Sequence, residues 1–271
     1  MSRIRLDDAL VERGLAEDIF LARALIMEGR VYIFEEKADK PSQMVQQTDA
    51  LSVRGDLNPF VSRGGHKLDK ALKVFGVDAK DRVCVDLGSS TGGFTDVLLR
   101  AGAKKVYAVD VGYGLLDWKL RNDERVRVME RTNARRIRPD QFDPRPSLGV
   151  TDVSFISLKA VLPAAFACLE GPERRFVALI KPQFEARSEQ VGKKGVVRDP
   201  EVHFEVVRGI VDFLPELGWR AQGLSYSPIT GPEGNIEFLL DIRPEQEAEN
   251  IVESEQILDV MRQAYDNFMK S

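Results

Sequence analysis

The stretch VCVDLGSSTGGFT, residues 83–95, decides the fold class of this chain. It begins with an apolar run that contains Asp86, continues into a glycine-rich turn and ends where an apolar helical pattern starts. A turn of this kind between a strand and a helix lets a ligand approach the backbone closely and presents the free amides of the helix N-terminus. The stretch therefore predicts a strand, a ligand-binding turn and a helix, in that order.

Strand-like and helix-like stretches alternate around this turn, from Phe60 onward. The predicted strands are Arg82–Leu87, Lys105–Val111, Arg125–Met129, Leu148–Val153, Phe176–Ile180, Ala221–Ser227 and Ile236–Ile242. The predicted amphipathic helices are Lys67–Phe75, Phe94–Arg100, Ser157–Leu169, Pro200–Leu217 and Glu247–Lys270. This alternation predicts an α/β fold with a doubly wound, mostly parallel sheet of seven strands. Because no helix separates the last two strands, we expect them to form an antiparallel pair at one edge.

The first 60 residues have a different rhythm and predict a separate, small α+β unit. Apolar residues recur at helical spacing in two short stretches separated at Gly14, and short strands follow at Val31–Phe34 and Ala50–Val53. We therefore expect three parts, which are an N-terminal domain of residues 1–60, an α/β domain of residues 61–245 and a C-terminal helix in residues 246–271 that packs on it.

The composition excludes several classes of protein. The chain has 271 residues, of which 43% are hydrophobic and 30% charged, and this is typical of a protein with a core rather than a disordered one. Cys84 and Cys168 lie in apolar runs and are expected to be reduced, buried thiols. No secretory signal is visible, and the longest nearly apolar run, Ala160–Leu169, has ten residues, whereas a membrane span needs ~20. We expect a soluble, cytoplasmic protein.

The formal net charge of −4 conceals a strong asymmetry along the chain. Residues 1–60 carry a net charge of −3, residues 61–200 carry +8 and residues 201–271 carry −9. A basic middle flanked by acidic ends favours a polyanion as the partner of the α/β domain. Uneven charge is also common in proteins that bind no nucleic acid, so charge alone leaves both interpretations open.

Three classes of ligand use a glycine-rich turn after a strand. The turn has the glycine spacing of a phosphate-binding P-loop, but Phe94 stands where that loop needs a lysine. Ser90 breaks the G-x-G-x-x-G pattern of dinucleotide sites. The acid Asp86 suits a positively charged ligand such as the amino-acid end of S-adenosylmethionine. Asp110, 24 residues later, is placed to accept both hydroxyls of a ribose.

Several motifs, in this order, resemble one protein family. VDLGSSTGGFTDVLL with AVDVGYG is similar to the S-adenosylmethionine loop of FtsJ-type methyltransferases. VSRGGHKL, TDVSFISL, LIKPQFE, GKKGVVRD and GNIEFLL are similar to the TlyA family, also known as hemolysin A. The resemblance runs from about Arg3 to Ile242 and implies a Rossmann-like class I methyltransferase fold. It also implies methylation of a ribose 2′-hydroxyl in ribosomal RNA, and an N-terminal RNA-binding domain of the type named after ribosomal protein S-four.

The cofactor that this resemblance implies is S-adenosylmethionine. We expect it to contact Asp86, Gly88, Ser89, Ser90, Thr91, Gly92, Gly93, Phe94, Asp110, Val111 and Asn133. Asn133 follows the third predicted strand, where it is a candidate contact to the adenine edge or a simple turn residue. No His/Cys/Asp cluster has the spacing of metal ligands, and we expect no metal.

The family also implies a catalytic Lys-Asp-Lys-Glu set, which matched motif by motif falls on Lys67, Asp152, Lys181 and Glu237. Asp152 and Lys181 end predicted strands, at the edge where open α/β sheets bind ligands. A ribose hydroxyl is a poor nucleophile and must lose its proton as it attacks. We expect Lys181 to be the base or to orient the hydroxyl. Asp152 and Glu237 would orient Lys181, and Lys67 would tune the charge or hold the nucleotide.

Basic residues are the expected contacts to RNA phosphates. In the α/β domain these are Arg63, Lys193, Lys194 and Arg198, and in the N-terminal domain Arg3, Arg5, Arg23 and Arg30. The 192–198 segment is alternatively a plain solvated loop. The N-terminal domain departs from the family, because Asp18-Ile19 replaces the usual Ser-Arg and Phe34-Glu35-Glu36 replaces Val-Asn-Gly. Either its four arginines form a local basic face or its RNA-binding role has faded.

Two other functions stay open, a membrane-active hemolysin and a non-catalytic RNA-binding factor. The sequence argues against the first, since it shows no span and residues 247–270 are too acidic for an anionic lipid surface. The presence of all four catalytic residues argues against the second. We expect ribosomal RNA or a ribosomal subunit as the partner of a monomer or weak dimer.

Overall fold

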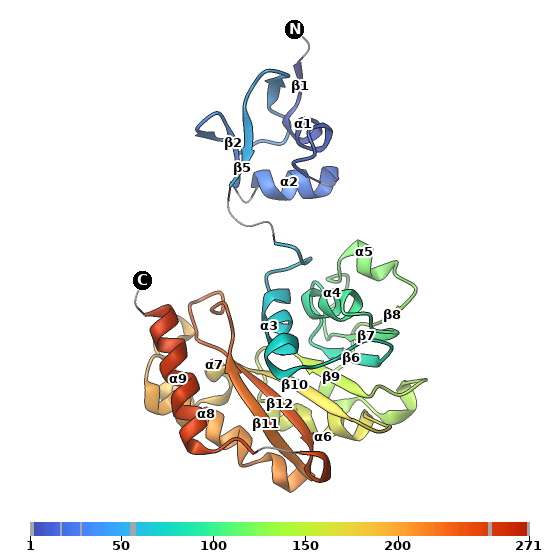
Figure 1. Cartoon of the computed structure of the whole chain (residues 1–271), viewed down its shortest axis with the longest axis vertical. Helices are drawn as coiled ribbons and strands as arrows, with labels where there is room; N and C mark the ends of the chain where they lie inside the picture. The colour runs from blue at the N-terminus through green and yellow to red at the C-terminus, as the bar shows by residue number, and fades with distance from the viewer. Residues whose placement is uncertain (1–2, 17, 28, 55–57, 249–250, 270–271) are drawn as a thin grey trace. The chain divides into compact units, whose positions relative to one another are not determined.

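The computed structural model describes residues 3–16, 18–27, 29–54, 58–248 and 251–269. The chain divides into two compact units, one ending at Asn58 and the other beginning at Pro59 (Figure 1). The predicted helix end at Lys270 lies outside the described residues.

The larger unit is built on one seven-stranded sheet. Its strands are β6 (Val83–Leu87), β7 (Lys105–Val109), β8 (Val126–Met129), β9 (Leu148–Thr151), β10 (Arg175–Ile180), β11 (Trp219–Tyr226) and β12 (Phe238–Pro244). They lie in the order β11-β12-β10-β9-β6-β7-β8. All neighbours are parallel except β12, which is antiparallel to both β10 and β11. The predicted doubly wound sheet and its antiparallel edge pair are thus confirmed.

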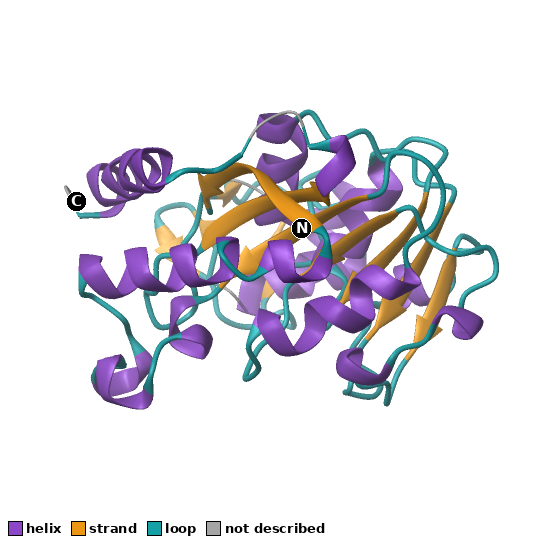
Figure 2. Ribbon diagram, turned by 90° about the horizontal axis from the view of Figure 1, so that it is seen from below, coloured by secondary structure: helices purple, strands orange, loops and turns teal. Residues whose placement is uncertain are grey.

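Helices cover both faces of this sheet (Figure 2). They are α3 (Gly65–Phe75), α4 (Gly93–Arg100), α5 (Trp118–Arg121), α6 (Leu158–Cys168), α7 (Pro182–Glu185), α8 (Pro200–Val211) and α9 (Ser254–Phe268). Short 3₁₀ turns occur at Ala134–Arg136, Pro139–Gln141, Ser188–Gln190, Lys193–Gly195, Leu214–Leu217 and Glu245–Glu247.

The core has two halves because successive side chains of a strand point to opposite faces. Along β10, Phe176 and Ala178 pack with α6, α8 and α9 on one face. Val177 and Leu179 pack with α3 and α4 on the other. A strand that is buried on both faces has a continuous apolar sequence, and the FVALI segment of β10 (residues 176–180) has this pattern. Cys84 and Cys168 are buried and free, as predicted.

Two helix predictions were wrong at their ends. The helix predicted over Pro200–Leu217 ends at Val211, and a separate 3₁₀ turn carries Pro215, which lacks the N–H that would bond the Val211 carbonyl in a continued helix. The helix predicted to begin at Glu247 begins at Ser254. The main-chain amide of Val252 donates to the carbonyl of Ala221 in β11 at 2.9 Å, so Val252 lies beside the sheet two residues before the helix starts.

The smaller unit is an α+β module. It contains β1 (Arg3–Arg5), α1 (Leu6–Glu12), α2 (Ile19–Met27), β2 (Val31–Ile33), β3 (Glu36–Lys37), β4 (Met44–Gln46) and β5 (Leu51–Val53). The strands form the antiparallel pair β1-β4 and the sheet β3-β2-β5. Leu6, Leu10 and Ile26 are fully buried in its own core. Sequence periodicity missed β1, β3 and β4, because strands of two or three residues carry too few alternations to detect.

His203 on α8 is fully buried and contacts the Tyr265 hydroxyl on α9 through Nδ1. Burial lowers the pKa of His203 to about 4 and raises the pKa of Tyr265 to about 12. A histidine that stays neutral in the fold but titrates near 6.5 when unfolded binds its proton preferentially in the unfolded state. Its contribution to stability is therefore complete above pH ~6.5 and declines as the pH falls toward 4.

We expect this group to remove up to ~3 kcal/mol of unfolding free energy between pH 6.5 and 4. The measurement is urea unfolding of the wild type and of His203→Gln across that range, since the variant lacks this proton but retains the carboxylates that also titrate. The stability difference between the two proteins should shrink as the pH falls. A difference that is constant with pH would show that His203 does not titrate with unfolding.

Candidate active site

A cavity of about 650 Å³ opens at the carboxyl ends of the parallel strands. Its walls come from the start of α3, the glycine-rich loop after β6, the segments after β9 and β10, and the segment before β12. The strand order reverses between β6 and β9, because the chain proceeds from β6 outward to β7 and β8 and then returns to β9. Open α/β sheets bind their ligands at such a reversal.

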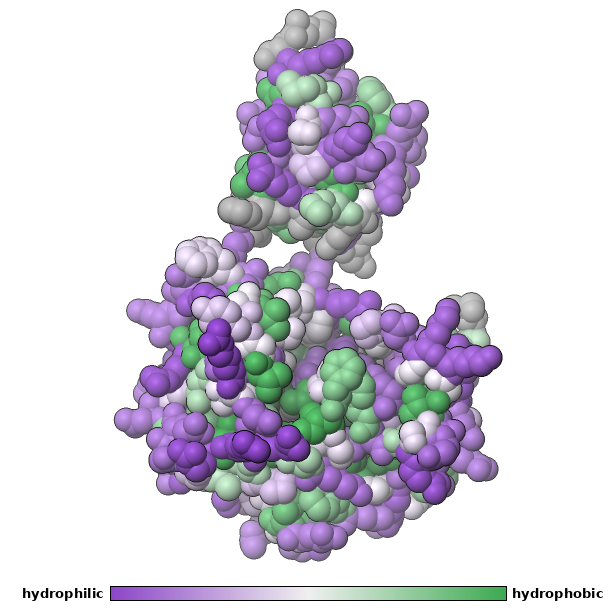
Figure 3. All heavy atoms as spheres, turned by 180° about the vertical axis from the view of Figure 1, so that it is seen from behind, coloured by the Kyte–Doolittle hydropathy of each residue, from purple (hydrophilic) through white to green (hydrophobic). Residues whose placement is uncertain are grey.

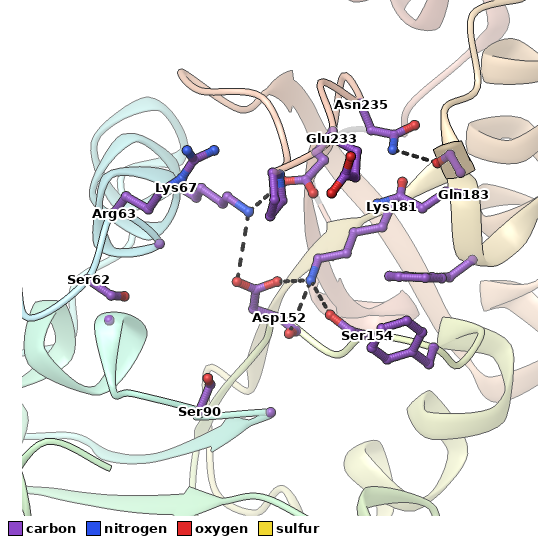
Figure 4. Close-up of a pocket in the computed structure, with 18 of the residues that line it drawn as sticks. Ser62, Arg63, Lys67, Ser90, Asp152, Ser154, Lys181, Gln183, Glu233 and Asn235 are labelled. Atoms are coloured by element: carbon purple, nitrogen blue, oxygen red, sulfur yellow. Dashed lines mark hydrogen bonds and ion pairs between the residues drawn. The ribbon is translucent and has the colours of Figure 1, made fainter. Parts of the chain in front are cut away.

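Four charged side chains converge on this cavity (Figure 4). Lys67 lies in the first turn of α3, Asp152 and Lys181 directly follow β9 and β10, and Glu237 directly precedes β12. Lys67 Nζ lies 2.6 Å from Glu237 Oε2 and 3.9 Å from Asp152 Oδ2. Lys181 Nζ lies 2.5 Å from Asp152 Oδ1. Positive and negative groups therefore alternate from Glu237 to Lys181.

This cluster is largely shielded from water. Glu237 is 1% exposed, Lys67 6% and Lys181 9%. Burial raises the pKa of the Glu237 carboxyl, and the neighbouring Lys67 ammonium opposes that shift. Buried charges are stable only when they are paired, and each of these has an opposite charge within 2.6 Å. Removing one member would leave its neighbour in the cavity wall without its partner.

Lys181 is held in one orientation by the strand end beside it. Its Nζ donates to Ser154 Oγ at 2.9 Å and to the main-chain oxygen of Asp152 at 3.4 Å, in addition to its ion pair. A lysine fixed in this way presents its ammonium at the cavity rather than sampling many rotamers. Sequence reasoning missed Ser154, although it lies in the TDVSF motif.

The glycine-rich loop forms the opposite wall of the cavity, where Figure 4 shows Ser90. Of the predicted cofactor contacts, Gly88, Ser89, Ser90, Thr91, Gly93 and Phe94 line it. Gly88 has a φ of +82°, and a Cβ there would lie 3.1 Å from the backbone of Asp152 and Val153. Glycine at this position therefore lets the loop pack directly against the end of β9.

Asp110 fixes the loop from the neighbouring strand. Its two carboxylate oxygens accept the main-chain amides of Ser90 at 2.8 Å and Gly112 at 2.7 Å. Each oxygen retains a lone pair for a further donor. Asp110 does not line the cavity itself, and neither does Gly92 at the N-terminus of α4.

Asp86 is completely buried beneath the loop rather than exposed in the cavity. Its Oδ2 accepts the Thr95 hydroxyl at 2.7 Å, whereas Oδ1 has no hydrogen-bond partner among the described residues. Burial raises the pKa of Asp86 to about 7, and the nearby carboxylates of Asp152 and Asp110 add to that shift. Asp86 is thus an acceptor with one free oxygen behind the glycine-rich turn.

The two remaining predicted cofactor contacts also lie outside the cavity lining. Val111 follows β7 and is 69% exposed. Asn133 caps a 3₁₀ turn, since its side chain accepts the amide of Arg135 at 3.0 Å. Both follow the carboxyl ends of strands, on the same edge of the sheet as the glycine-rich loop.

The predicted RNA contacts of the larger unit lie at or near this cavity. Arg63 and Lys194 line it, and Arg63 donates to the carbonyl of Thr230. Lys193 and Arg198 are exposed in the adjoining loop. The cavity thus has cationic side chains at its rim and ion-paired ones in its wall.

Two residues that sequence reasoning missed shape this rim. Asn235, which is 2% exposed, donates to the Gly195 carbonyl at 2.9 Å and accepts the Val197 amide at 2.9 Å, so it ties the basic loop to the segment that carries Glu237. Phe155 is 90% exposed, has a φ of +63° and lines the cavity. Both lie inside motifs quoted above, Asn235 in GNIEF and Phe155 in TDVSF. In each motif only the charged residue was predicted to act in the site.

The predicted RNA contacts of the smaller unit are partly engaged with an acid. Arg5 Nη2 and Arg23 Nε both lie 2.8 Å from Asp7 Oδ2. The hydrogen bond from Arg5, together with the one from Arg23, lowers the pKa of Asp7 to about 2. Arg30 Nε donates to the Arg54 carbonyl at 3.2 Å, and Arg3 is exposed. Arg5 and Arg23 keep 42% and 48% of their side chains exposed, so a phosphate can still reach them.

The described residues contain neither a candidate metal site nor a helix that could span a membrane. Within residues 3–16, 18–27, 29–54, 58–248 and 251–269, His, Cys, Asp and Glu form no group of three or more that could hold a metal ion. None of the helices in these ranges has the length and apolar character that crossing a membrane requires. On the face of the larger unit seen in Figure 3, apolar residues gather near the centre and hydrophilic ones surround them.

Comparison with known proteins relates both units to described families. The FtsJ-like methyltransferase model matches residues 60–243, and the S4 domain model matches residues 4–51. The chain is 51% identical to a candidate rRNA methyltransferase, YqxC, of Bacillus subtilis (strain 168), over 96% of this chain and 94% of that protein. It is 48% identical to the 16S/23S rRNA (cytidine-2′-O)-methyltransferase TlyA of Mycobacterium tuberculosis (strain ATCC 25618 / H37Rv), over 89% and 90% of the two chains.

A solved structure is also similar over the whole length. It is that of a candidate hemolysin from Streptococcus thermophilus, with a TM-score of 0.78 and 42% identity, covering 100% of this chain and 98% of the other. The match therefore extends over both units of the chain.

Proposed function

This chain is a member of the TlyA family of FtsJ-like methyltransferases, and we propose that it transfers a methyl group from S-adenosylmethionine to a ribose 2′-hydroxyl of ribosomal RNA. The observation that carries the proposal is the position of the Lys67–Asp152–Lys181–Glu237 cluster. It lines the same cavity as the glycine-rich loop, so a methyl donor on one wall would face polar groups able to receive a proton on the other.

The loop and its neighbours fit the cofactor. The exposed turn residues Ser90 and Thr91 present the backbone to the cavity. Asp110 is fixed beside them with lone pairs left for ribose hydroxyls. Asp86, buried beneath the turn, would act on the positive charge of the cofactor across the loop, and that charge would favour its ionised form. When bound, S-adenosylmethionine supplies a methyl group on a positively charged sulfur. Val111 and Asn133 would contact its adenosine part.

The residues of the cluster would handle the proton. As the ribose oxygen bonds to the methyl carbon, the carbon–sulfur bond breaks and the hydroxyl proton must leave. Lys181, oriented by Asp152 and Ser154, is placed to hold the hydroxyl and, in its neutral form, to accept that proton. Lys67, which is paired with Glu237 and lies between the two carboxylates, would hold Asp152 in position.

The cavity rim suits a single-stranded or unstacked nucleotide. Phe155 offers an exposed aromatic face on which a base could stack, and Arg63, Lys193, Lys194 and Arg198 offer charges for the phosphates. In the smaller unit, Arg3, Arg5, Arg23 and Arg30 are the proposed phosphate contacts, and an RNA phosphate would compete with Asp7 for Arg5 and Arg23. A ribosomal substrate would place the enzyme in the cytoplasm.

The proposal is tested by incubating the protein with methyl-tritiated S-adenosylmethionine and ribosomal RNA, on naked RNA and on isolated subunits. The label is expected in 2′-O-methylated nucleosides after digestion of the RNA. Label on a base instead of a ribose would contradict the assignment of the reaction. RNA binding without label would support a non-catalytic factor, and lysis of erythrocytes without label would support a membrane-active protein.

A further inference from the structure

A second cavity, of about 270 Å³, lies at the opposite end of the sheet from the catalytic cluster. Arg175, the first residue of β10, lines it, whereas Lys181 follows the last residue of the same strand. Six residues of extended chain separate the two sites by roughly 20 Å. Four cations line this second cavity against two carboxylates, and these are Lys80, Arg82, Arg175 and Arg243, with Asp78 and Glu173.

Two of the cations are fixed by the fold. Arg175 pairs with Asp241 at 2.7 Å and donates to the carbonyls of Phe75 and Gly76 at the end of α3. Arg82 donates to the Ser147 and Glu173 carbonyls at 2.8 and 2.7 Å, and among the described residues it has no carboxylate at ion-pair distance. Burial lowers the pKa of Arg82. The nearby Cys84 and Glu173 oppose that shift, and the Arg175 and Arg243 charges add to it. The cavity floor therefore carries fixed, incompletely neutralised positive charge.

Arg243 is the cation that the fold does not explain. Its Nε is buried and has no hydrogen-bond partner within the described part of the chain, and no ion pair forms there. Its cross-strand neighbour is Arg220, another cation, which is itself paired with Glu245. A buried donor without an acceptor carries a free-energy cost, which is larger when the group is charged, because its lost hydration is not replaced. An anion in the cavity would remove that cost.

We propose that this cavity binds a phosphoryl group, held by Arg243 and Lys80 over the fixed guanidinium groups of Arg82 and Arg175. The planar fork of an arginine matches two phosphate oxygens, and a lysine adds a point charge. Of the two acids, Asp78 accepts the Lys80 amide at 2.8 Å and Glu173 is exposed, and among the described residues neither forms an ion pair with Arg243. The site takes no part in methyl transfer. Its phosphoryl group comes either from the RNA backbone or from free phosphate.

The test compares the full-length wild type with Arg243→Gln and Lys80→Gln. Arg262→Gln serves as the matched control, because Arg262 is an exposed arginine on α9 that pairs with Asp259 and is remote in the fold from this cavity. Melting temperatures are measured in inorganic phosphate and in sodium chloride of equal ionic strength. Phosphate is expected to stabilise the wild type and the control, and its dissociation constant should rise at least ~10-fold in Arg243→Gln.

To identify the source of the phosphoryl group, the affinity of each protein for RNA is measured between about 50 and 200 mM salt. If the RNA backbone supplies it, Arg243→Gln should flatten the log–log salt dependence by somewhat under one unit, whereas an unchanged slope with a lost phosphate response assigns the site to free phosphate. Lys80 is exposed, so its variant cannot fail by unfolding, and it should weaken the same response. The proposal would be overturned if phosphate stabilised all four proteins equally. It would also be overturned if phosphate stabilised none of them and the salt dependence of RNA binding were the same in all four.

Discussion

Replacing Lys181 by alanine is expected to lower methyl transfer to RNA by ~10²-fold or more while leaving the affinity for S-adenosylmethionine nearly unchanged. The reason is its place in the cavity, where it is 9% exposed and bound to Asp152 and Ser154. No other described lysine lies against Asp152 at such short range, since Lys67 is 3.9 Å away and engaged with Glu237. The loss should therefore appear in kcat rather than in cofactor binding.

The measurement is single-turnover transfer of labelled methyl groups, together with calorimetric titration of the cofactor. Lys181→Met keeps the side-chain volume and separates lost chemistry from an empty space. Lys159→Ala, an exposed lysine on α6, is the matched control and should keep full activity. Near-normal turnover of both Lys181 variants would exclude this residue as the base.

Replacing Asp110 by alanine is expected to abolish the stabilisation of the protein by S-adenosylmethionine. At a ligand concentration of 100 times Kd, binding stabilises the folded state by ~2.7 kcal/mol, which is ~5–10 °C in a chain of this size. Asp110 holds the amides of Ser90 and Gly112, so its loss removes both the proposed ribose acceptor and the anchor of the loop.

The control for this effect is Asp69→Ala, which removes an α3 carboxylate that is paired with Lys73 on the surface. Asp110→Asn distinguishes the two roles of Asp110, because an amide keeps one acceptor oxygen and one loop contact. A partial shift is expected for Asp110→Asn and none for Asp110→Ala. An undiminished cofactor shift in Asp110→Ala would remove this residue from the site.

The four charged residues were predicted from the family resemblance, matched motif by motif, and the predicted strand ends agreed with the positions of two of them. The TDVSF and LIKPQ motifs place Asp152 and Lys181 after neighbouring parallel strands, and parallel strands end at one edge. The pairing within the cluster could not be predicted. Which carboxylate contacts which lysine depends on the register of β9, β10 and β12 and on the side-chain rotamers. The spacing of the motifs in the sequence determines neither of these.

Burial within the site could not be read from the sequence. The sequence placed Asp86 against the ligand, and the structure places it beneath the loop with one oxygen bound to Thr95. An acid before a glycine-rich turn looks the same in sequence whether its side chain points to the ligand or to the core. The engagement of Arg5 and Arg23 with Asp7 was invisible for a similar reason, since Arg23 and Asp7 are 16 positions apart.

The sequence by itself determined the order of strands and helices, the separate small unit, the glycine-rich turn and the positions of the charged motifs. These are local properties, because apolar periodicity, glycine and a charge after an apolar run act within a few residues. Only the tertiary structure decided that the charged groups form an alternating chain in one cavity, and that Arg243 meets Arg82 and Arg175 in another. Both depend on strands that are distant in sequence lying side by side, since the electrostatic energy of a buried charge is set by its neighbours in space.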